Sequence, residues 1–322
     1  MQSHPPIVAL VRDTGDNRLR KLLTDEVPGI VTVVVGPHLS LSLEKLLMTG
    51  QSPRLVIVSG RLYPAERPEL VSLVRRVIPG AEFLVVSAAE DKPPVLHQLG
   101  VDRVRHLVIS PAAGDTADAA RGQLGHAVKN LTEGTPWTAV DYLKEGTKVH
   151  EFPLCRSDEK EAIIAAVAGL IDGDSDETEL FRQKVALLTD EMLENALYAA
   201  PRTPEGEQLY RKGEQRPVSR EEQIVFRFGF DGETVAMEAT DGWGSLRPET
   251  VIQHLAKNQT LAGDVGETGG RGIFIIWQFL EQLYISICPG RRTVVGGHVR
   301  RSSPTDLEVP RGFHIVTTAC CI

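Results

Sequence analysis

The sequence predicts an α/β protein with two domains, on three observations. Short apolar runs alternate with helical patterns through residues 1–111, which is typical of a parallel sheet covered by helices on both faces. A long helical pattern, two glycine-bearing turns and further strand patterns follow between residues 148 and 300. The length of 322 residues allows two sizeable hydrophobic cores. We therefore expect domains at 1–111 and 148–300, a connector at 112–147 and a C-terminal tail at 301–322.

Composition and charge narrow the class of protein. With 42% hydrophobic and 24% charged residues the chain has the composition of an ordinary soluble protein. A formal net charge of -8 argues against a general nucleic-acid binder. No apolar run approaches the length of a membrane span, and no basic segment precedes a signal-like core at the N-terminus. We therefore expect a cytoplasmic protein that binds neither nucleic acid nor membrane.

Five apolar runs predict the strands of the first domain, and four helical patterns predict the helices between them. The runs cover residues 7–13, 31–36, 54–60, 82–88 and 106–110, and the helical patterns cover residues 18–27, 42–50, 69–78 and 94–100. This order resembles the receiver domain of response regulators, whose fold is flavodoxin-like.

A receiver requires an acceptor Asp after the third strand, an acidic pair after the first, a hydroxyl after the fourth and a Lys after the fifth. The sequence has Ser59 at the acceptor position, Asp13 as the one acidic residue counted after the first strand, Ser87 at the hydroxyl position and Ser110 at the lysine position. A hydroxyl is a poor acceptor for aspartyl-phosphate chemistry, and a site without its Lys loses charge stabilisation. The first domain is therefore predicted to be a pseudo-receiver with an interaction or dimerisation role.

The connector combines a weak helical pattern with a group of apolar residues. A helix is expected after Asp115 or Thr116, although Gly122 and Gly125 weaken it. Such a helix would stack against its mate in a homodimer. The apolar residues gather at 137–143, so we expect that part to dock on one of the domains.

The second domain contains an amphipathic helix over residues 181–200 that ends before Pro201. Its apolar residues recur at spacings of three and four: Phe181, Val185, Leu188, Met192 and Ala196. Glu191 and Asn195 are four residues apart, so they share one face of the helix and can address one ligand.

Two glycine-bearing turns follow. In TDGWGSL at 240–246, Asp241 lies at a strand end, where a carboxylate can accept a hydrogen bond from the exocyclic amine of adenine. Gly242 and Gly244 would let the backbone turn tightly beside a flat ring. GETGGRGIF at 266–274 runs into an apolar helix, whose first unpaired amides suit a phosphate.

Residues 148–300 resemble the GHKL ATPase superfamily, an α/β-sandwich fold shared by histidine kinases and gyrase-type ATPases, and the bacterial anti-sigma-factor serine kinases are the most similar branch. The resemblance implies ATP and Mg²⁺ as ligands. In it Asn195 binds the magnesium, Glu191 polarises the attacking hydroxyl or water, and Asp241 reads the adenine. The remaining residues that it implies at the nucleotide are Gly244 of the first glycine box, Gly266, Gly269, Gly270 and Gly272 of the second, and Thr293 near the base.

Trp243 stands where the family's first glycine box has its first motif glycine, and Gly244 follows one place late. Two functions stay open. One is a serine-protein kinase acting on a signalling partner, such as an anti-sigma-antagonist protein or a sigma factor. The other is a non-catalytic pseudo-receiver and pseudo-ATPase adaptor that works by protein–protein interaction. A histidine kinase is a weaker third reading, because His126 in the connector lacks a phosphotransfer motif.

Two polar or terminal stretches and the cysteines complete the sequence. Residues 202–223 are predicted to be a surface excursion whose basic residues are solvated or reach a phosphate or an acidic partner; these are Arg202, Arg211, Lys212 and Arg216. The end of the tail has strand character and is expected to join the sheet or another chain. Cys155, Cys288, Cys320 and Cys321 lack a paired metal-site spacing, so we expect spare or buried thiols, with oxidation or metal binding at Cys320 and Cys321 as the alternative.

Overall fold

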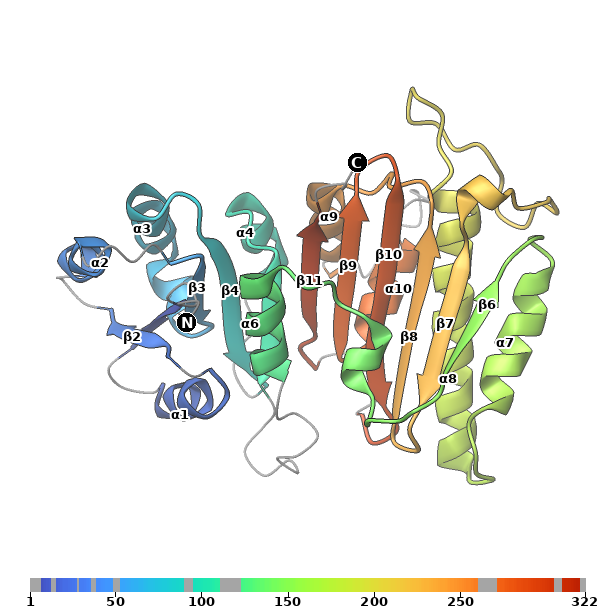
Figure 1. Ribbon diagram of the computed structural model, residues 1–322, viewed down its shortest axis with the longest axis horizontal. Coiled ribbons are helices and arrows are strands. Elements are labelled where there is room, and N and C mark those ends of the chain that lie inside the picture. Colours follow the sequence, from blue (N-terminus) through green and yellow to red (C-terminus); the bar gives the residue numbers. More distant parts are fainter. Residues whose placement is uncertain are drawn as a thin grey trace. The chain divides into compact units, whose positions relative to one another are not determined.

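The structure is a computed structural model, and it describes residues 7–12, 16–27, 29–35, 39–48, 53–89, 95–110, 123–259, 271–303 and 309–318. The chain divides into two compact units, Met1–Pro136 (unit 1) and Trp137–Ile322 (unit 2). Figure 1 labels the elements of both.

Unit 1 is built on a parallel sheet in the order β2-β1-β3-β4-β5. Its elements are β1 (Ile7–Val11), α1 (Asn17–Glu26), β2 (Val31–Val34), α2 (Leu39–Met48), β3 (Leu55–Ser59), α3 (Leu62–Val77), β4 (Glu82–Ala88), α4 (Leu96–Val101), β5 (His106–Ser110) and α6 (Gln123–Glu133). Helix α1 contacts α6 and α2 contacts α3, and Figure 1 shows α1 and α3 on opposite sides of the strands. The α/β character and the five strands predicted for this part are confirmed.

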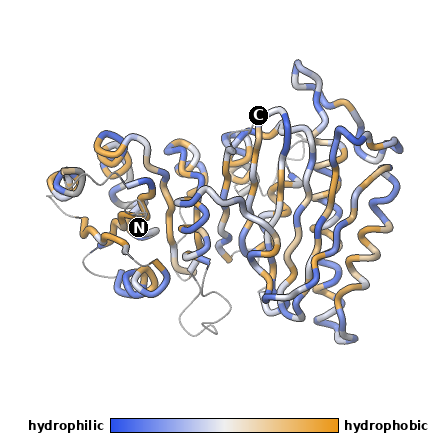
Figure 2. Tube along the Cα trace, in the orientation of Figure 1, coloured by the Kyte–Doolittle hydropathy of each residue, from blue (hydrophilic) through white to orange (hydrophobic). Residues whose placement is uncertain are grey.

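The apolar runs become strands because both faces of the sheet are covered. All five residues of β3 are buried, as are four of the five in β1, which is the pattern of a strand between two layers of helix. The helices carry both apolar and polar residues, visible as mixed colours along them in Figure 2. The sequence pattern therefore reflects burial on two sides for the strands and on one side for the helices.

A buried carboxylate lies at the carboxyl end of this sheet. Asp16, at the start of α1, is 4% exposed. Its Oδ1 accepts a hydrogen bond from Ser59 Oγ at 2.9 Å, and its Oδ2 accepts one from the Arg12 amide at 2.6 Å. Asp13, the acidic residue that the sequence predicts at this position, lies outside the described residues. The Ser59 hydroxyl is thus buried and already engaged with an acidic group.

Unit 2 is built on a six-stranded part of sheet in the order β11-β9-β10-β8-β7-β6, in which β11 is parallel to β9 and the other neighbours are antiparallel. Its strands are β6 (Val149–Pro153), β7 (Val225–Phe230), β8 (Thr234–Asp241), β9 (Gln282–Cys288), β10 (Arg292–Arg300) and β11 (Gly312–Thr317). Its helices are α7 (Glu159–Gly169), α8 (Asp176–Glu194), α9 (Pro248–Gln259) and α10 (Arg271–Phe279), with the short turns η1 (Ala139–Tyr142), η2 (Asn195–Ala199) and η3 (Arg220–Glu222).

Helix α8 is the centre of the helical layer of unit 2. It packs against α7, α10 and β8, and Figure 1 shows α8 and α10 behind the sheet. The predicted apolar face is confirmed, since Phe181, Val185, Leu188 and Met192 are all buried. Ser175 caps the helix by accepting a hydrogen bond from the Thr178 amide at 3.2 Å. The helix therefore begins at Asp176, five residues earlier than the sequence pattern indicates.

The segment 137–143 docks on the other face of this sheet, as the sequence predicted for the end of the connector. Turn η1 contacts β7, β8 and β10. The Trp137 ring stacks on His314 with centroids 4.7 Å apart, and Tyr142 stacks on His298 at 4.3 Å. The Ala139 amide donates to Glu238 Oε2 at 3.1 Å. Residues 112–122, where the connector helix was expected to start, lie outside the described residues.

A glycine in β10 allows a tyrosine to cross that strand. Gly296 is in register with Glu238 on β8 and with Tyr284 on β9. A Cβ at Gly296 would collide with the Tyr284 ring. The Tyr284 hydroxyl instead passes over Gly296 and donates to Glu238 Oε2. Glu238 is 3% exposed, so this donor helps to satisfy a buried carboxylate.

We expect Tyr284→Phe to lower the free energy of unfolding of unit 2 by about 1.5–3 kcal/mol, because a buried carboxylate loses one donor. Tyr142→Phe is the control, because its hydroxyl makes no hydrogen bond among the described residues while its ring keeps the same stacking. Denaturant titration followed by tryptophan fluorescence reports on unit 2, where Trp137, Trp243 and Trp277 all lie. Equal effects of the two variants would contradict the role of the Tyr284 hydroxyl.

The end of the chain joins the sheet of unit 2. Strand β11 pairs with β9 over Gly312–Thr317, which confirms the strand expected there.

Cys155 is exposed and free, whereas Cys288 is disulfide-bonded, so the expectation of a spare thiol is wrong for Cys288. Cys320 and Cys321 lie outside the described residues. No helix in the described part of the chain is long and apolar enough to span a membrane.

Candidate functional site

The last turn of α8 changes its hydrogen-bond pattern at Asn195. The Ala200 amide donates to the Asn195 carbonyl at 2.8 Å, a spacing of five residues, and η2 is a π-helix. Such a turn inserts one extra residue into the helix and is frequent at functional sites. Asn195 is therefore presented at a point where the helix widens, one turn beyond Glu191.

The start of α10 lies directly against these two side chains. A Cβ placed on Gly272 would lie 2.8 Å from Glu191 Oε2 and 2.9 Å from Asn195 Oδ1. Only a residue without a side chain lets the α10 backbone approach both groups this closely. The structure thus brings together three of the residues predicted for one site. Gly266, Gly269 and Gly270 lie outside the described residues.

Glu191 belongs to an acidic cluster in which its neighbours are paired. Lys160 on α7 contacts Asp190 at 2.5 Å and Glu194 at 2.9 Å, and Lys212 also pairs with Glu194. Burial raises the pKa of Glu191, Lys212 opposes the rise, and Glu194 and Asp190 add to it. Burial would also raise the pKa of Glu194, but hydrogen bonds from Lys212 and Lys160 lower it. Glu191 is thus the member of the cluster best suited to accept or orient a proton.

Asp241 ends β8 at the edge of the sheet, in register with Thr293 at the start of β10. It is 5% exposed, and its Oδ1 accepts hydrogen bonds from the Trp243 amide at 2.9 Å and the Gly244 amide at 3.4 Å. Burial raises the pKa of Asp241 to about 6, and hydrogen bonds from these two amides and the proximity of Thr293 oppose that rise. A carboxylate keeps about four acceptor positions, so Asp241 retains acceptor capacity for a ligand.

The first glycine turn packs tightly on its neighbours. Gly244 has φ +56, and a Cβ there would collide with the Cys288 carbonyl and lie 2.6 Å from the Arg291 amide nitrogen. At Gly242 a Cβ would collide with the Glu221 carbonyl. These contacts require glycine at both positions for packing, which no local sequence pattern indicates. The binding role predicted for Gly244 stays a prediction.

Three buried polar atoms at these elements lack a protein partner. They are Asn195 Nδ2, Trp243 Nε1 and Thr293 Oγ1, none of which makes a hydrogen bond within the described part of the chain. Thr293 Oγ1 lies close enough to Asp241 to favour its charged form, but not in hydrogen-bonding geometry. Other such atoms occur elsewhere, for example Ser87 Oγ. A buried polar group without a hydrogen-bond partner lowers the stability of the folded protein by about 1–3 kcal/mol. A polar ligand bound among these residues could supply the missing hydrogen bonds to all three atoms.

These residues form two groups joined by packing. Glu191, Asn195 and Gly272 meet where α8 and α10 touch, and Asp241 and Thr293 meet at the end of the sheet. Turn η2 contacts β8, which links the groups. Within the described ranges there is no group of three or more His, Cys, Asp or Glu side chains that could hold a metal ion.

The excursion after α8 is only partly the solvated loop that was predicted. Arg216 is 7% exposed and pairs with Glu222, and Lys212 pairs with Glu194. The sequence carried one signal for Glu222, because Ser219 and Glu222 have the spacing of a capping box, which η3 forms. No spacing pattern linked Lys160 to Asp190, thirty residues along the chain. His126 is exposed on α6.

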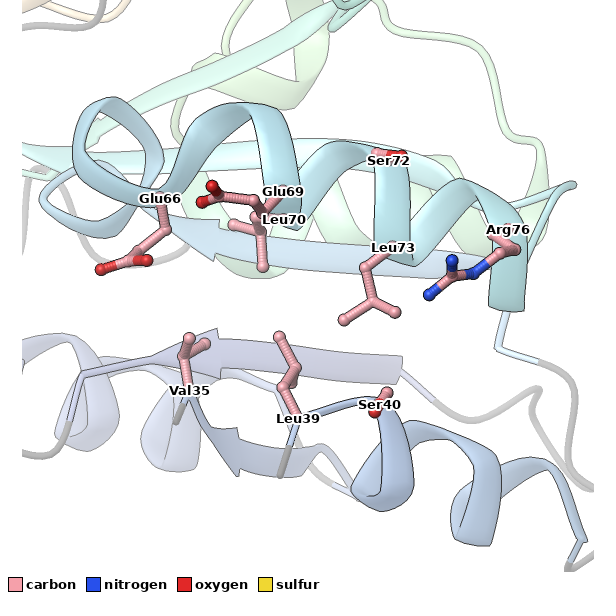
Figure 3. A pocket seen from close by; sticks show the side chains of 9 residues that line it. All are labelled: Val35, Leu39, Ser40, Glu66, Glu69, Leu70, Ser72, Leu73 and Arg76. Atoms are coloured by element: carbon pink, nitrogen blue, oxygen red, sulfur yellow. The ribbon is translucent and has the colours of Figure 1, made fainter. Parts of the chain in front are cut away.

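Unit 1 has a separate cleft of about 420 Å³ between α2 and α3. Figure 3 shows Glu66 near one end and Arg76 at the other, with Leu39, Leu70 and Leu73 between them. The charged side chains, Glu66, Glu69 and Arg76, are spread along α3 instead of converging on one point, and leucine side chains from both helices lie between the two walls. This cleft is therefore a weaker candidate for a catalytic site than the residues around Glu191, Asn195 and Asp241 in unit 2.

Neither protein-family models nor curated proteins give a match to this chain.

Proposed function

We propose that unit 2 is a GHKL-type domain that binds ATP with Mg²⁺, and that the chain is a bacterial signal-transduction regulator acting as an anti-sigma-type serine-protein kinase on a partner protein. The observation that carries this proposal is the contact of Gly272 with both Glu191 and Asn195. Residues predicted from separate motifs to serve one nucleotide thus lie within contact distance of one another.

The architecture of both units supports the proposal. A mixed sheet with α7, α8 and α10 in one layer agrees with the α/β sandwich of the GHKL superfamily. The order β2-β1-β3-β4-β5 agrees with a flavodoxin-like receiver domain. A fold by itself does not identify an activity, so the residues of the site carry the proposal.

The donor set fits magnesium and a nucleotide. Mg²⁺ prefers oxygen ligands and is commonly held by one or two protein groups together with phosphates and water. The amide oxygen of Asn195 offers such a ligand. The acceptor Asp241 and the donors Trp243 Nε1 and Thr293 Oγ1 are buried polar groups of the kind that recognise a base.

The reaction we propose is phosphoryl transfer to a hydroxyl. The first amides of α10 are unpaired by helix geometry and hold phosphate oxygens. Bound magnesium would supply charge neutralisation. Glu191 orients the attacking hydroxyl and accepts its hydrogen bond, and its raised pKa favours taking up the proton as transfer proceeds. Catalysis in such a site comes mainly from positioning.

We expect the full chain to bind ATP with magnesium in calorimetry and Asn195→Ala to lose most of the magnesium-dependent affinity. Glu191→Gln should bind as the unchanged protein does, while its ATP hydrolysis falls by about 100-fold or more, because the group that orients the nucleophile is gone. Gln183→Ala, on an exposed position of α8, is the control. Failure of the unchanged protein to bind ATP would refute the proposed function.

A non-catalytic adaptor is the second candidate, and the Asp16–Ser59 hydrogen bond favours it. That bond occupies the position where a receiver would accept a phosphoryl group, so unit 1 would act by contact with a partner or a second copy. Under this alternative the protein either binds ATP but hydrolyses it no faster than Glu191→Gln does, or does not bind ATP. The same two assays therefore separate the candidates.

A further inference from the structure

We infer that Arg216 and Glu222 form a positioning pair that holds the two halves of the proposed nucleotide site in register, an inference that rests on the proposed function. Among the described residues, neither side chain makes a hydrogen bond to the groups proposed to bind the ligand. The pair acts through the backbone next to Asn195 on one side and next to Asp241 on the other.

The pair is buried and bidentate. Arg216 Nη1 donates to Glu222 Oε1 at 2.8 Å, and Arg216 Nη2 donates to Glu222 Oε2 at 2.7 Å. The two side chains are 4% and 6% exposed. The Tyr210 ring lies 3.8 Å from the guanidinium carbon and covers it. Two parallel charge-assisted hydrogen bonds of this kind define geometry more strictly than a single one.

On one side the pair holds the π-helix that carries Asn195. Arg216 Nη2 also donates to the Leu197 carbonyl at 2.8 Å. Leu197 lies in η2, two residues after Asn195. The Tyr198 hydroxyl adds a second tie by donating to the Glu214 carbonyl at 3.0 Å. The π-helix η2 is thus attached through Leu197 and Tyr198 to the segment that contains Glu214 and Arg216.

On the other side the pair holds the turn after Asp241. The Gly242 amide donates to the Glu222 carbonyl at 2.6 Å, and the absence of a side chain at Gly242 permits this approach. Glu222 is itself fixed, because its Oε1 also accepts from the Ser219 amide at 2.9 Å. The backbone from Asp241 to Gly242 is therefore tied to the same ion pair as η2.

This arrangement matters because Asn195 and Asp241 belong to different elements and would address opposite ends of one nucleotide. A displacement of about 1 Å between such groups can cost about 100-fold in a reaction that depends on positioning. Buried ion pairs contribute little net stability, because desolvation offsets their attraction. We assign the pair a role in geometry, which can be separated from stability by experiment.

The experiment compares Arg216→Lys with the apolar double variant Arg216→Met with Glu222→Leu, both in the full chain. Lysine keeps the charge but loses the planar fork, and the double variant removes both charges, so no unpaired one stays buried. Each variant is titrated with ATP and magnesium by calorimetry, and its folding is checked by thermal denaturation. Arg156→Lys is the matched control, since Arg156 makes an exposed bidentate pair with Asp158.

We expect both variants, at temperatures where they are folded, to bind ATP at least about 10-fold more weakly, and the emission of Trp243 to change in the free protein because its turn shifts. The control should match the unchanged protein. Unaltered affinity in a folded Arg216→Lys or double variant would overturn the inference and leave the proposed function standing. If the double variant does not fold, Arg216→Lys alone decides. An unchanged protein that does not bind ATP would refute the proposed function and the inference with it.

Discussion

Replacing Asp241 by Asn is expected to weaken ATP binding by about 10- to 150-fold while leaving unit 2 folded. Asn is isosteric and its carbonyl oxygen can still accept from the Trp243 and Gly244 amides, which are 2.9 and 3.4 Å from Asp241 Oδ1. Its amide nitrogen, however, would face the exocyclic amine of adenine donor to donor. Loss of a charged buried acceptor costs about 1.5–3 kcal/mol. Calorimetric titration with ATP and magnesium measures the change.

The pH dependence of binding should follow the same carboxyl. Burial raises the pKa of Asp241 to about 6, and only the charged form is a full acceptor. Affinity should therefore fall as the pH drops through about 6, by at most about tenfold per pH unit. The phosphates of ATP titrate too, so the profile of Asp241→Asn is the reference. A wild-type profile parallel to that of the variant would contradict the assignment.

The free energy of unfolding should change with pH in the direction opposite to the affinity for ATP. The pKa of Asp241 is about 6 in the folded protein against 3.8 for an ordinary Asp. The folded protein therefore keeps this proton over a pH range where the unfolded chain has lost it. The contribution of Asp241 to the free energy of unfolding is fully present below about pH 4 and is lost as the pH rises through about 6. This contribution amounts to about 3 kcal/mol.

At pH 8 the Asn variant should thus be as stable as the unchanged protein, or more stable by up to about 3 kcal/mol, because it buries no charge. Asp158→Asn, an exposed carboxylate paired with Arg156, is the control and should alter neither binding nor stability appreciably. A marked loss of stability in Asp241→Asn would mean that the carboxylate is there to hold the fold. Lost binding with retained stability is the signature of a ligand-binding group.

Gly244→Ala is expected to lower the free energy of unfolding of unit 2 by about 2–5 kcal/mol. A residue with a Cβ pays about 1–2 kcal/mol to adopt φ +56. The added carbon would also collide with the Cys288 carbonyl and approach the Arg291 amide nitrogen to 2.6 Å. Both are backbone atoms of the β9–β10 turn, which cannot rotate away, and overpacking of this kind adds about 1–3 kcal/mol.

Gly290→Ala separates the two causes. Gly290 has φ +68, but a Cβ there would meet nothing within 4 Å. Gly290→Ala should therefore cost only the about 1–2 kcal/mol needed to place a residue with a Cβ at positive φ. Denaturant titration by tryptophan fluorescence follows both variants. Equal losses in the two would show that the contact with the β9–β10 turn does not constrain Gly244.

The candidate site was predictable to different degrees for its different members. Glu191 and Asn195 were paired from their spacing of four on one helical pattern, a local property that burial of Val185 and Met192 on the same helix bears out. The placement of Asp241 at a strand end followed from alternation in residues 235–239, and β8 does end at Asp241. These inferences held because period and chain direction alone determine which residues share a face or an end.

The sequence by itself thus determined the α/β character, the five strands of unit 1, the apolar face of α8 and the strand near the C-terminus. Each depends on a pattern within about twenty residues, which a folding chain expresses locally. Only the tertiary structure decided that Gly272 touches Glu191 and Asn195, that Asp16 binds Ser59, and that Arg216 joins Leu197 to Glu222. These contacts join residues up to 81 positions apart. They depend on how closely two backbones pack and on which buried charges are paired. Local sequence periodicity predicts neither of these.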